Sequence, residues 1–79
     1  MAASGAEDAL EKLARNRRID AVLLLGEGVA AAAAEIREED PGAPPLYASA
    51  RAGDIPGVRP LPDAPADALA EAVARLLEP

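Results

Sequence analysis

An uninterrupted apolar run constrains the fold of this 79-residue chain more than any other stretch. The run consists of Ala21, Val22, Leu23, Leu24 and Leu25, with the mainly polar segment Arg-Arg-Ile-Asp before it and Gly26-Glu27-Gly28 after it. A strand with one solvated face would alternate polar and apolar residues, whereas this run is apolar throughout. We therefore predict a strand that is buried on both faces, so that other segments must cover it on two sides.

Amphipathic helices are predicted before and after this strand. In the first helix, the residues that share one apolar face are Ala6, Ala9, Leu10, Leu13 and Ala14. Ser4 and Glu7 have the spacing of a capping box, which predicts that this helix begins there. The second helix follows Gly28 and must end by Asp40, because Pro41 displaces the residue before it from the α region.

A third helix is predicted near the C-terminus, with Asp63 as its cap and Pro65 in its first turn. Its apolar face consists of Leu69, Ala72, Val73, Leu76 and Leu77. Residues 46–49 and 58–61 are shorter strand candidates, and Pro60 suits an edge position for the second of them.

The connection between these two shorter strands has only eight residues, 50–57. Because a helical crossover needs a dozen or more, the connection is either an irregular loop between parallel strands or a hairpin-like return. We favour the parallel arrangement. The predicted order is helix, strand, helix, strand, strand, helix in one domain, residues 1–79. This order indicates an α/β fold with a small, three-stranded, mostly parallel sheet.

The composition argues against several functional classes. The chain has no cysteine and no histidine, which removes disulfides, the usual zinc ligands and a histidine general base. A net charge of −6 and a single aromatic residue, Tyr47, argue against nucleic-acid and anionic-membrane partners. No apolar run reaches the roughly 20 residues of a membrane span. We therefore expect a cytoplasmic protein with no metal and no cofactor.

Three segments together resemble the second half of a receiver domain from bacterial two-component response regulators. Residues 17–25 resemble the approach to the third strand of that family, residues 39–50 resemble its fourth strand, and residues 59–77 resemble its last strand and final helix. The resemblance covers nearly the whole chain. It implies a flavodoxin-like, receiver-like fragment that serves in bacterial signal transduction.

The charged groups of receiver chemistry are replaced in this chain. The resemblance places the phosphoacceptor aspartate at Leu25 and the lysine of the last strand at Leu61, whereas Ser49 keeps the switch position. The acidic pair that holds the metal ion has no counterpart, because the first strand of the family is missing. Phosphoryl transfer needs a nucleophile and charge neutralisation. We therefore predict no catalysis and no phosphorylation, and a module that acts by protein-protein association.

Loss of the family's first strand implies an unpaired edge on the most apolar strand. Such edges promote pairing, and domains this small commonly oligomerise. We predict that two copies meet at this edge, or that another signalling protein supplies the missing strand. The predicted interface residues are Ala21, Val22, Leu23, Leu24 and Leu25 of the strand, with Leu10 and Leu13 of the first helix.

An alternative function comes from the glycine pattern after the strand. Residues 26–31, Gly-Glu-Gly-Val-Ala-Ala, match G-x-G-x-x-A between a strand and a helix, as in dinucleotide-binding turns. Backbone amides near Gly26 and Gly28 could bind a phosphate or a nucleotide. Glu27 opposes an anion, and one βαβ unit cannot hold a whole dinucleotide. Glycines that serve a turn and a helix start explain the pattern more simply.

The remaining polar residues have simple explanations as well. Asp20, Glu27, Asp54 and Asp63 could gather around a cation, but in a chain with fourteen acidic residues such side chains are usually solvated. Ser49 has no histidine or nearby lysine to activate it, so its hydroxyl is expected to cap backbone. We expect Tyr47 to pack half-buried, with its hydroxyl at the rim of the core.

Overall fold

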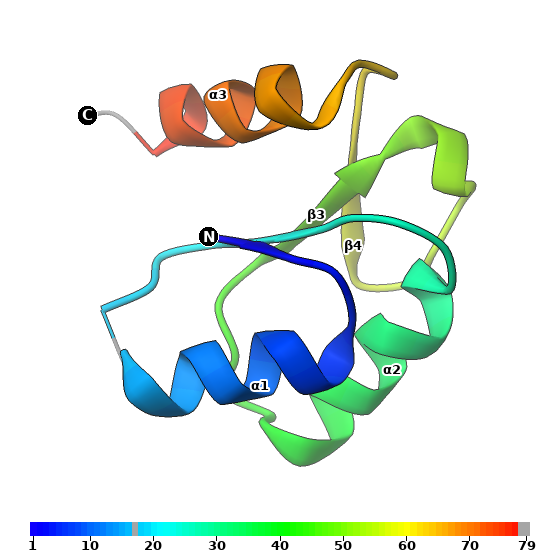
Figure 1. The fold of residues 1–79 in the computed structure, drawn as a ribbon. Helices are drawn as coiled ribbons and strands as arrows, with labels where there is room; N and C mark the ends of the chain where they lie inside the picture. Colours follow the sequence, from blue (N-terminus) through cyan, green and yellow to red (C-terminus); the bar gives the residue numbers. More distant parts are fainter. Residues whose placement is uncertain (17, 78–79) are drawn as a thin grey trace.

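A sheet of four parallel strands, in the order β1-β2-β3-β4, carries the fold in the computed structural model, which describes residues 1–16 and 18–77. The elements along the chain are β1 (Ala2–Ala3), α1 (Ala6–Arg15), β2 (Val22–Leu24), α2 (Val29–Glu39), β3 (Leu46–Ser49), the 3-10 turn η1 (Ala50–Ala52), β4 (Val58–Leu61) and α3 (Ala66–Leu76) (Figure 1). The predicted α/β class and the predicted order of helices are confirmed. The predicted strand count of three is wrong, because β1 was missed.

Strand β2 is buried on both faces, as its uninterrupted apolar sequence predicts. Leu23 pairs with Ala2 of β1 on one side and with Tyr47 of β3 on the other. Val22 and Leu24 point into one core, and Ala21 and Leu23 belong to the other. These four side chains are at most 2% exposed. The strand is therefore the centre of two cores that lie on opposite sides of the sheet.

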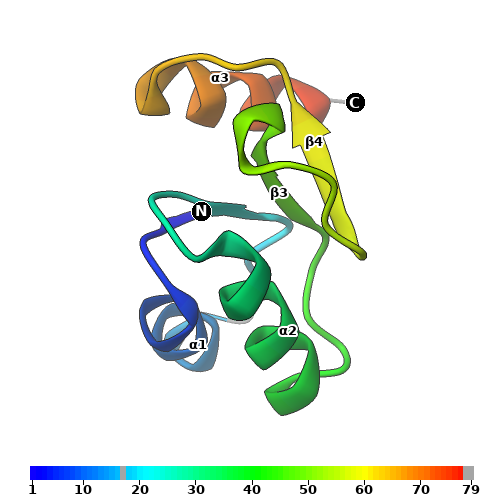
Figure 2. The same cartoon turned by 90° about the vertical axis from the view of Figure 1, so that its right-hand side faces the viewer.

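Helices α1 and α2 cover one face of the sheet, and α3 covers the other (Figure 2). On the two-helix face, the buried helix residues are Ala6, Ala9 and Leu13 of α1 with Val29, Ala32, Ala33 and Ile36 of α2. On the α3 face, Leu69 and Val73 pack against Leu23, Tyr47 and Leu61. The small alanines let the helices lie close to the sheet, because they place no bulky side chain between backbone and strand.

The edge of β2 that we expected to be open is paired with β1. The backbone N–H of Leu25 donates to the carbonyl of Ala3 at 2.8 Å, and that of Leu23 donates to the carbonyl of Met1 at 2.7 Å. The terminal ammonium of Met1 donates to the carbonyl of Ala21 at 3.1 Å. The expectation of an unpaired β2 edge is therefore wrong.

The connection between β3 and β4 joins two parallel strands, which confirms the favoured arrangement. Its eight residues need no helical crossover because Gly53 and Gly57 adopt φ values of 91° and 79°, a region that turns the chain sharply. The Arg37 guanidinium of α2 donates to the carbonyl of Pro56 at 3.2 Å and holds this loop against the helix.

The predicted cap of the first helix is wrong. The N-cap of α1 is Gly5, which has no side-chain cap, and the carboxylate of Asp8 takes the role that the capping box assigns to the carboxylate of Glu7. The Asp8 carboxylate accepts from the backbone N–H of Ser4 and from Lys12 Nζ, both at 3.2 Å. The backbone hydrogen bond first, and then Lys12, lower the pKa of Asp8 below its usual value.

The predicted cap of the last helix is wrong too. Helix α3 begins at Ala66 with Pro65 as its N-cap, whose fixed φ suits a helix start. Asp63 lies outside the helix, and its carboxylate accepts from the hydroxyl of Ser49 at 3.2 Å. Among residues 1–16 and 18–77, no helix combines the length and the apolar character that a membrane crossing requires.

We predict that Leu23→Ala lowers the free energy of unfolding by about 2–5 kcal/mol, because the cavity it leaves lies at the centre of the sheet. Leu23 is 1% exposed. A domain of this size has a total stability of roughly 4–12 kcal/mol, so the loss should be visible in urea unfolding followed by circular dichroism. Leu76→Ala is the matched control, because Leu76 is 59% exposed. Equal losses for the two variants would contradict the packing described for β2.

Candidate functional site

One hollow of the molecule lies where β2 and β3 end and α2 and α3 begin. Its volume is 750 Å³, and its lining includes Leu25, residues 26–30, Ser49, Arg51, Asp63 and Ala66. In open parallel sheets, ligands bind outside the carboxyl ends of the strands. We call this hollow the strand-end pocket.

The two glycines of the sequence pattern shape one wall of the strand-end pocket. Gly26 and Gly28 have φ values of 82° and 72°, in the left-handed region that side chains disfavour. Helix α2 begins directly after them at Val29, with Gly28 as its N-cap. The first amides of a helix carry partial positive charge and attract anions. Gly26 and Gly28 therefore lie in the turn between β2 and α2, as the sequence predicts.

Polar residues from three segments of the chain line the strand-end pocket. The hydroxyl of Ser49 accepts from the backbone N–H of Arg51 and donates to the carboxylate of Asp63, each at 3.2 Å. The prediction that Ser49 caps backbone is thereby confirmed. Arg51 brings one positive charge to the lining, whereas Glu27 and Asp63 bring two negative charges. The pocket therefore offers backbone amides and one guanidinium to an anion. Its two carboxylates outnumber that guanidinium, so the local charge disfavours anion binding.

The structure brings together only part of the imagined carboxylate cluster. Glu27 and Asp63 line the strand-end pocket, whereas Asp20 and Asp54 are not part of its lining. Within the described residues, no three histidine, cysteine, aspartate or glutamate side chains are grouped as metal ligands would be. Tyr47, which we expected to be half-buried, is only 6% exposed, and the Arg59 guanidinium lies 5.9 Å from its ring centroid.

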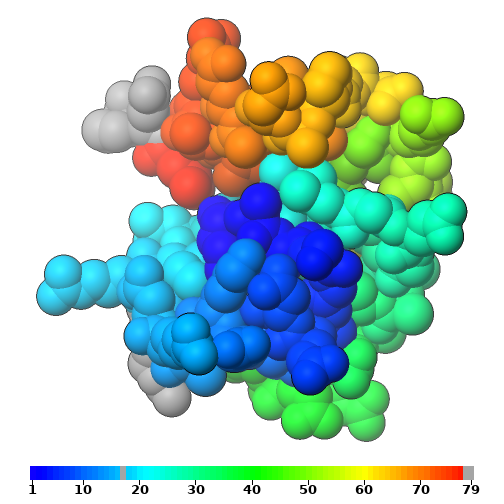
Figure 3. Space-filling model, in the orientation of Figure 1, coloured from blue at the N-terminus to red at the C-terminus, as the bar shows by residue number. Residues whose placement is uncertain are grey.

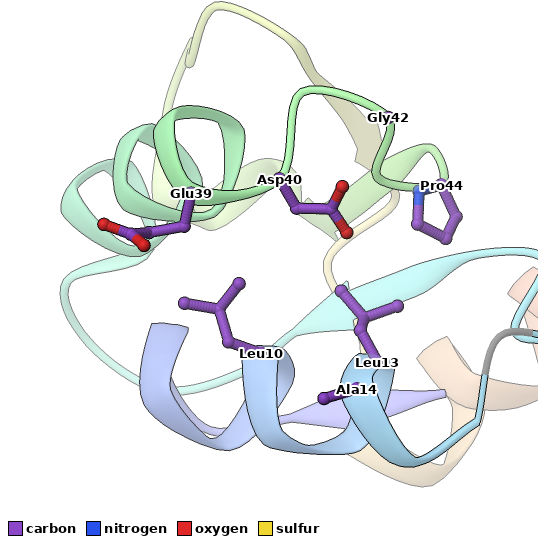
Figure 4. A pocket seen from close by; sticks show the side chains of 7 residues that line it. All are labelled: Leu10, Leu13, Ala14, Glu39, Asp40, Gly42 and Pro44. Atoms are coloured by element: carbon purple, nitrogen blue, oxygen red, sulfur yellow. The ribbon is translucent and has the colours of Figure 1, made fainter.

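A second hollow lies between the C-terminal half of α1 and the turn that follows α2 (Figure 4). It has a volume of 590 Å³ and is lined by Leu10, Leu13, Ala14, Glu39, Asp40, Gly42 and Pro44. The side chains of Leu10 and Leu13 point toward the turn, and the carboxyl groups of Glu39 and Asp40 lie on the opposite side of the hollow (Figure 4). We call this hollow the acid-rimmed groove.

The predicted interface residues fall into two groups. Leu10 and Leu13 line the acid-rimmed groove, where Leu10 is half-buried and Leu13 is 8% exposed. Ala21, Val22, Leu23 and Leu24 are buried inside the molecule, and Leu25 is half-buried beside the strand-end pocket. The four buried strand residues therefore cannot touch a partner in this fold, whereas Leu10 and Leu25 are partly exposed.

The end of α3 is exposed, which its sequence pattern does not predict. Leu76 and Leu77 were assigned to its apolar face, yet they are 59% and 44% exposed, and they are the large apolar side chains left exposed within the described residues. Leu76 also borders a shallow hollow of 510 Å³, whose other lining residues are Leu61, Pro62, Ala68, Glu71, Ala72 and Arg75. One sequence signal could have suggested this exposure. Leu69 and Val73 already supply the face that packs on the sheet, and the two adjacent leucines follow them in the last turn of the helix.

Comparisons of the chain with models of protein families, with curated proteins and with solved structures gave no match.

We predict that Gly28→Ala destabilises the fold by about 1–2 kcal/mol, because an L side chain disfavours the left-handed φ that Gly28 adopts. Nothing lies within 4 Å of the added methyl group, so the loss is one of backbone conformation alone. Gly5→Ala is the control, since Gly5 has an extended backbone with equally open space. The measurement is urea unfolding, and a Gly28→Ala variant as stable as Gly5→Ala would contradict the turn geometry.

Proposed function

We propose that this chain is a non-catalytic, receiver-like signalling module that acts by protein-protein association, with a second copy or with another signalling protein. The observation that carries the proposal is the exposure of Leu76 and Leu77 at the end of α3. Figure 3 shows the last turn of this helix (red) at the surface of the molecule.

Apolar side chains near Leu76 recur along one side of α3, beside the ion pair of Glu71 and Arg75. Ala68, Ala72 and Leu76 recur every four residues and border the same shallow hollow as Pro62. Contiguous apolar patches on small proteins mark interaction sites, whereas single exposed apolar residues do not. This strip therefore favours a protein partner over a purely solvated role for α3.

The ends of the strands support a role without catalysis. Leu25 and Leu61 occupy the positions at which the receiver resemblance puts the phosphoacceptor and the lysine, and they lie just after β2 and at the end of β4. A leucine side chain supplies neither a nucleophile nor a charge to a phosphoryl group. Association is thus the part of receiver behaviour that this sequence retains the means to perform.

The pairing of β1 with β2 moves the proposed contact surface. The sequence predicts the contact at the β2 edge, but β1 occupies that edge. The accessible apolar residues lie instead at the end of α3 and in the acid-rimmed groove, which includes Leu10.

We predict that the chain associates with itself as its concentration rises, because Leu76 and Leu77 leave solvent when copies meet. The measurement is sedimentation equilibrium between 10 µM and 1 mM in about 0.15 M salt, at which charge repulsion between acidic chains is screened beyond roughly 8 Å. The average mass should rise above the 8.0 kDa of one chain. A mass that stays at 8.0 kDa up to 1 mM would contradict self-association.

A second candidate function is binding of a phosphate or a nucleotide in the strand-end pocket. The observation in its favour is the convergence of Arg51 with the amides that follow Gly28 at the carboxyl ends of the strands. Two carboxylates in the same lining weaken this candidate, which is why we place it second.

We predict for this second candidate that ADP or inorganic phosphate at millimolar concentration shifts the amide resonances of Val29 and Ala30 in NMR spectra. Arg51→Ala should weaken the response, because it removes the cation of the pocket. Arg15→Ala removes the same charge from an exposed position in α1 and should leave the response unchanged. Resonances that do not move in the wild-type chain would exclude anion binding here.

A further inference from the structure

The last residues of α3 extend past the core that holds the rest of the helix. Leu69 and Val73 are 4% and 3% exposed, whereas Leu76 is 59% exposed although it continues the same helical face. In Figure 1 this end of α3 lies away from β3 and β4, toward the marked C-terminus. We call Arg75, Leu76 and Leu77 the α3 tail.

The acid-rimmed groove provides an apolar surface that could cover the exposed leucines of the α3 tail. Its floor is apolar, with Leu10, Leu13 and Ala14 from α1 and Pro44 from the turn, and its volume of 590 Å³ lies within the range of sites that hold side-chain clusters or small ligands. In Figure 4 the leucine side chains face an open space that no side chain of the lining fills.

Charge makes the groove and the tail complementary. Glu39 and Asp40 flank the apolar floor, and neither takes part in the three ion pairs found among the described residues. Arg75 sits beside the two exposed leucines and pairs with Glu71 at 2.8 Å, with both side chains at least 65% exposed. Exposed pairs of this kind contribute little, so Arg75 can exchange Glu71 for a groove carboxylate at small cost.

The tail cannot reach the groove of its own chain. Helix α3 packs on one face of the sheet, whereas α1 and α2, which form the groove, pack on the opposite face (Figure 2). A tail that enters such a groove must therefore come from another molecule.

We propose that the α3 tail of one copy docks into the acid-rimmed groove of a second copy, with Leu76 and Leu77 over Leu10 and Ala14 and with Arg75 at Glu39 and Asp40. This inference rests on the association function proposed above and specifies its partner and surfaces. Because the two surfaces differ, the contact is head-to-tail: in each pair one molecule keeps a free groove and the other keeps a free tail, unless a ring closes.

A complementation experiment tests this contact with two variants of the full chain. Leu76→Glu with Leu77→Glu removes the tail, and both positions are exposed, so the fold has no reason to change. Ala14→Arg blocks the groove, since Ala14 is exposed on its floor and arginine is a good helix former in the last turn of a helix. Each variant alone should self-associate at least about ten-fold more weakly than the wild type. The tail variant loses the burial of two leucines, and the groove variant places a charged arginine where an apolar side chain should pack.

An equimolar mixture of the two variants should associate again. The tail variant keeps an intact groove, and the groove variant keeps an intact tail, so the mixture forms one-to-one pairs whose mass levels off at twice 8.0 kDa. With the tail variant labelled for NMR, the unlabelled groove variant should shift the amides of Leu10, Leu13 and Asp40.

Matched controls carry the same chemical changes at other exposed positions. Ala70→Glu with Ala74→Glu places two carboxylates on the outer side of α3, and Ala34→Arg places an arginine on α2 outside the groove. Both controls should associate as the wild type does. A loss of association in either control would show that net charge, and not the tail or the groove, governs the contact.

The outcomes separate this inference from the function on which it rests. A wild-type chain that is monomeric at 1 mM overturns both the self-association and the tail-in-groove contact. A wild type that associates, together with a variant mixture that stays monomeric, overturns the tail-in-groove contact alone. An Ala14→Arg chain that associates as strongly as the wild type would also overturn it and would indicate a symmetric contact between two α3 tails.

Discussion

Burial of β2 on both faces is the constraint on which the rest of the structure depends. Val22 and Leu24 require a cover on one side of the sheet, and Ala21 and Leu23 require one on the other. Helices α1 and α2 provide the first cover and α3 provides the second. The strand also needs a neighbour at each edge for its backbone groups, because a buried N–H or carbonyl without a partner is costly. Strand β3 serves one edge, and the first three residues of the chain serve the other.

The elements that the sequence predicts are those with a local pattern. Apolar periodicity predicted the three helices, an apolar run predicted β2, and two shorter strand candidates predicted β3 and β4. Strand β1 has two residues and no pattern of its own, since backbone hydrogen bonds to Leu23 and Leu25 hold it. Those bonds depend on the tertiary fold, because the chain must bring its N-terminus beside β2 to form them. The helix caps failed for a related reason: Asp8 competes for the amide of Ser4, and Ser49 engages Asp63 through a contact fourteen residues away.

The candidate sites also combine local features, which the sequence predicts, with tertiary features, which it does not. The sequence predicts the glycines of the strand-end pocket, because the turn between a strand and a helix is a local feature. It does not predict that Ser49, Arg51 and Asp63 converge there, since this depends on how β3 and β4 lie in register. Leu10 and Leu13 were predicted as contact residues from an unpaired strand edge, and that reason was wrong. They line a groove because a space remains between α1 and the turn after α2. The separation of these two segments is a tertiary feature that no local residue pattern predicts.

The composition of the cores links fold and association. Of the eighteen buried core residues in the described part of the chain, seven are alanine. An alanine methyl allows close helix packing but removes little apolar area from water, so each one contributes less than a leucine would. A small domain with such a core has little stability to spare. Its larger side chains at the end of α3 remain outside the core, and a partner that covers them binds the folded chain and not the unfolded one. Association of this kind stabilises the fold by mass action, so that the strength of the contact and the stability of the domain rise together with concentration.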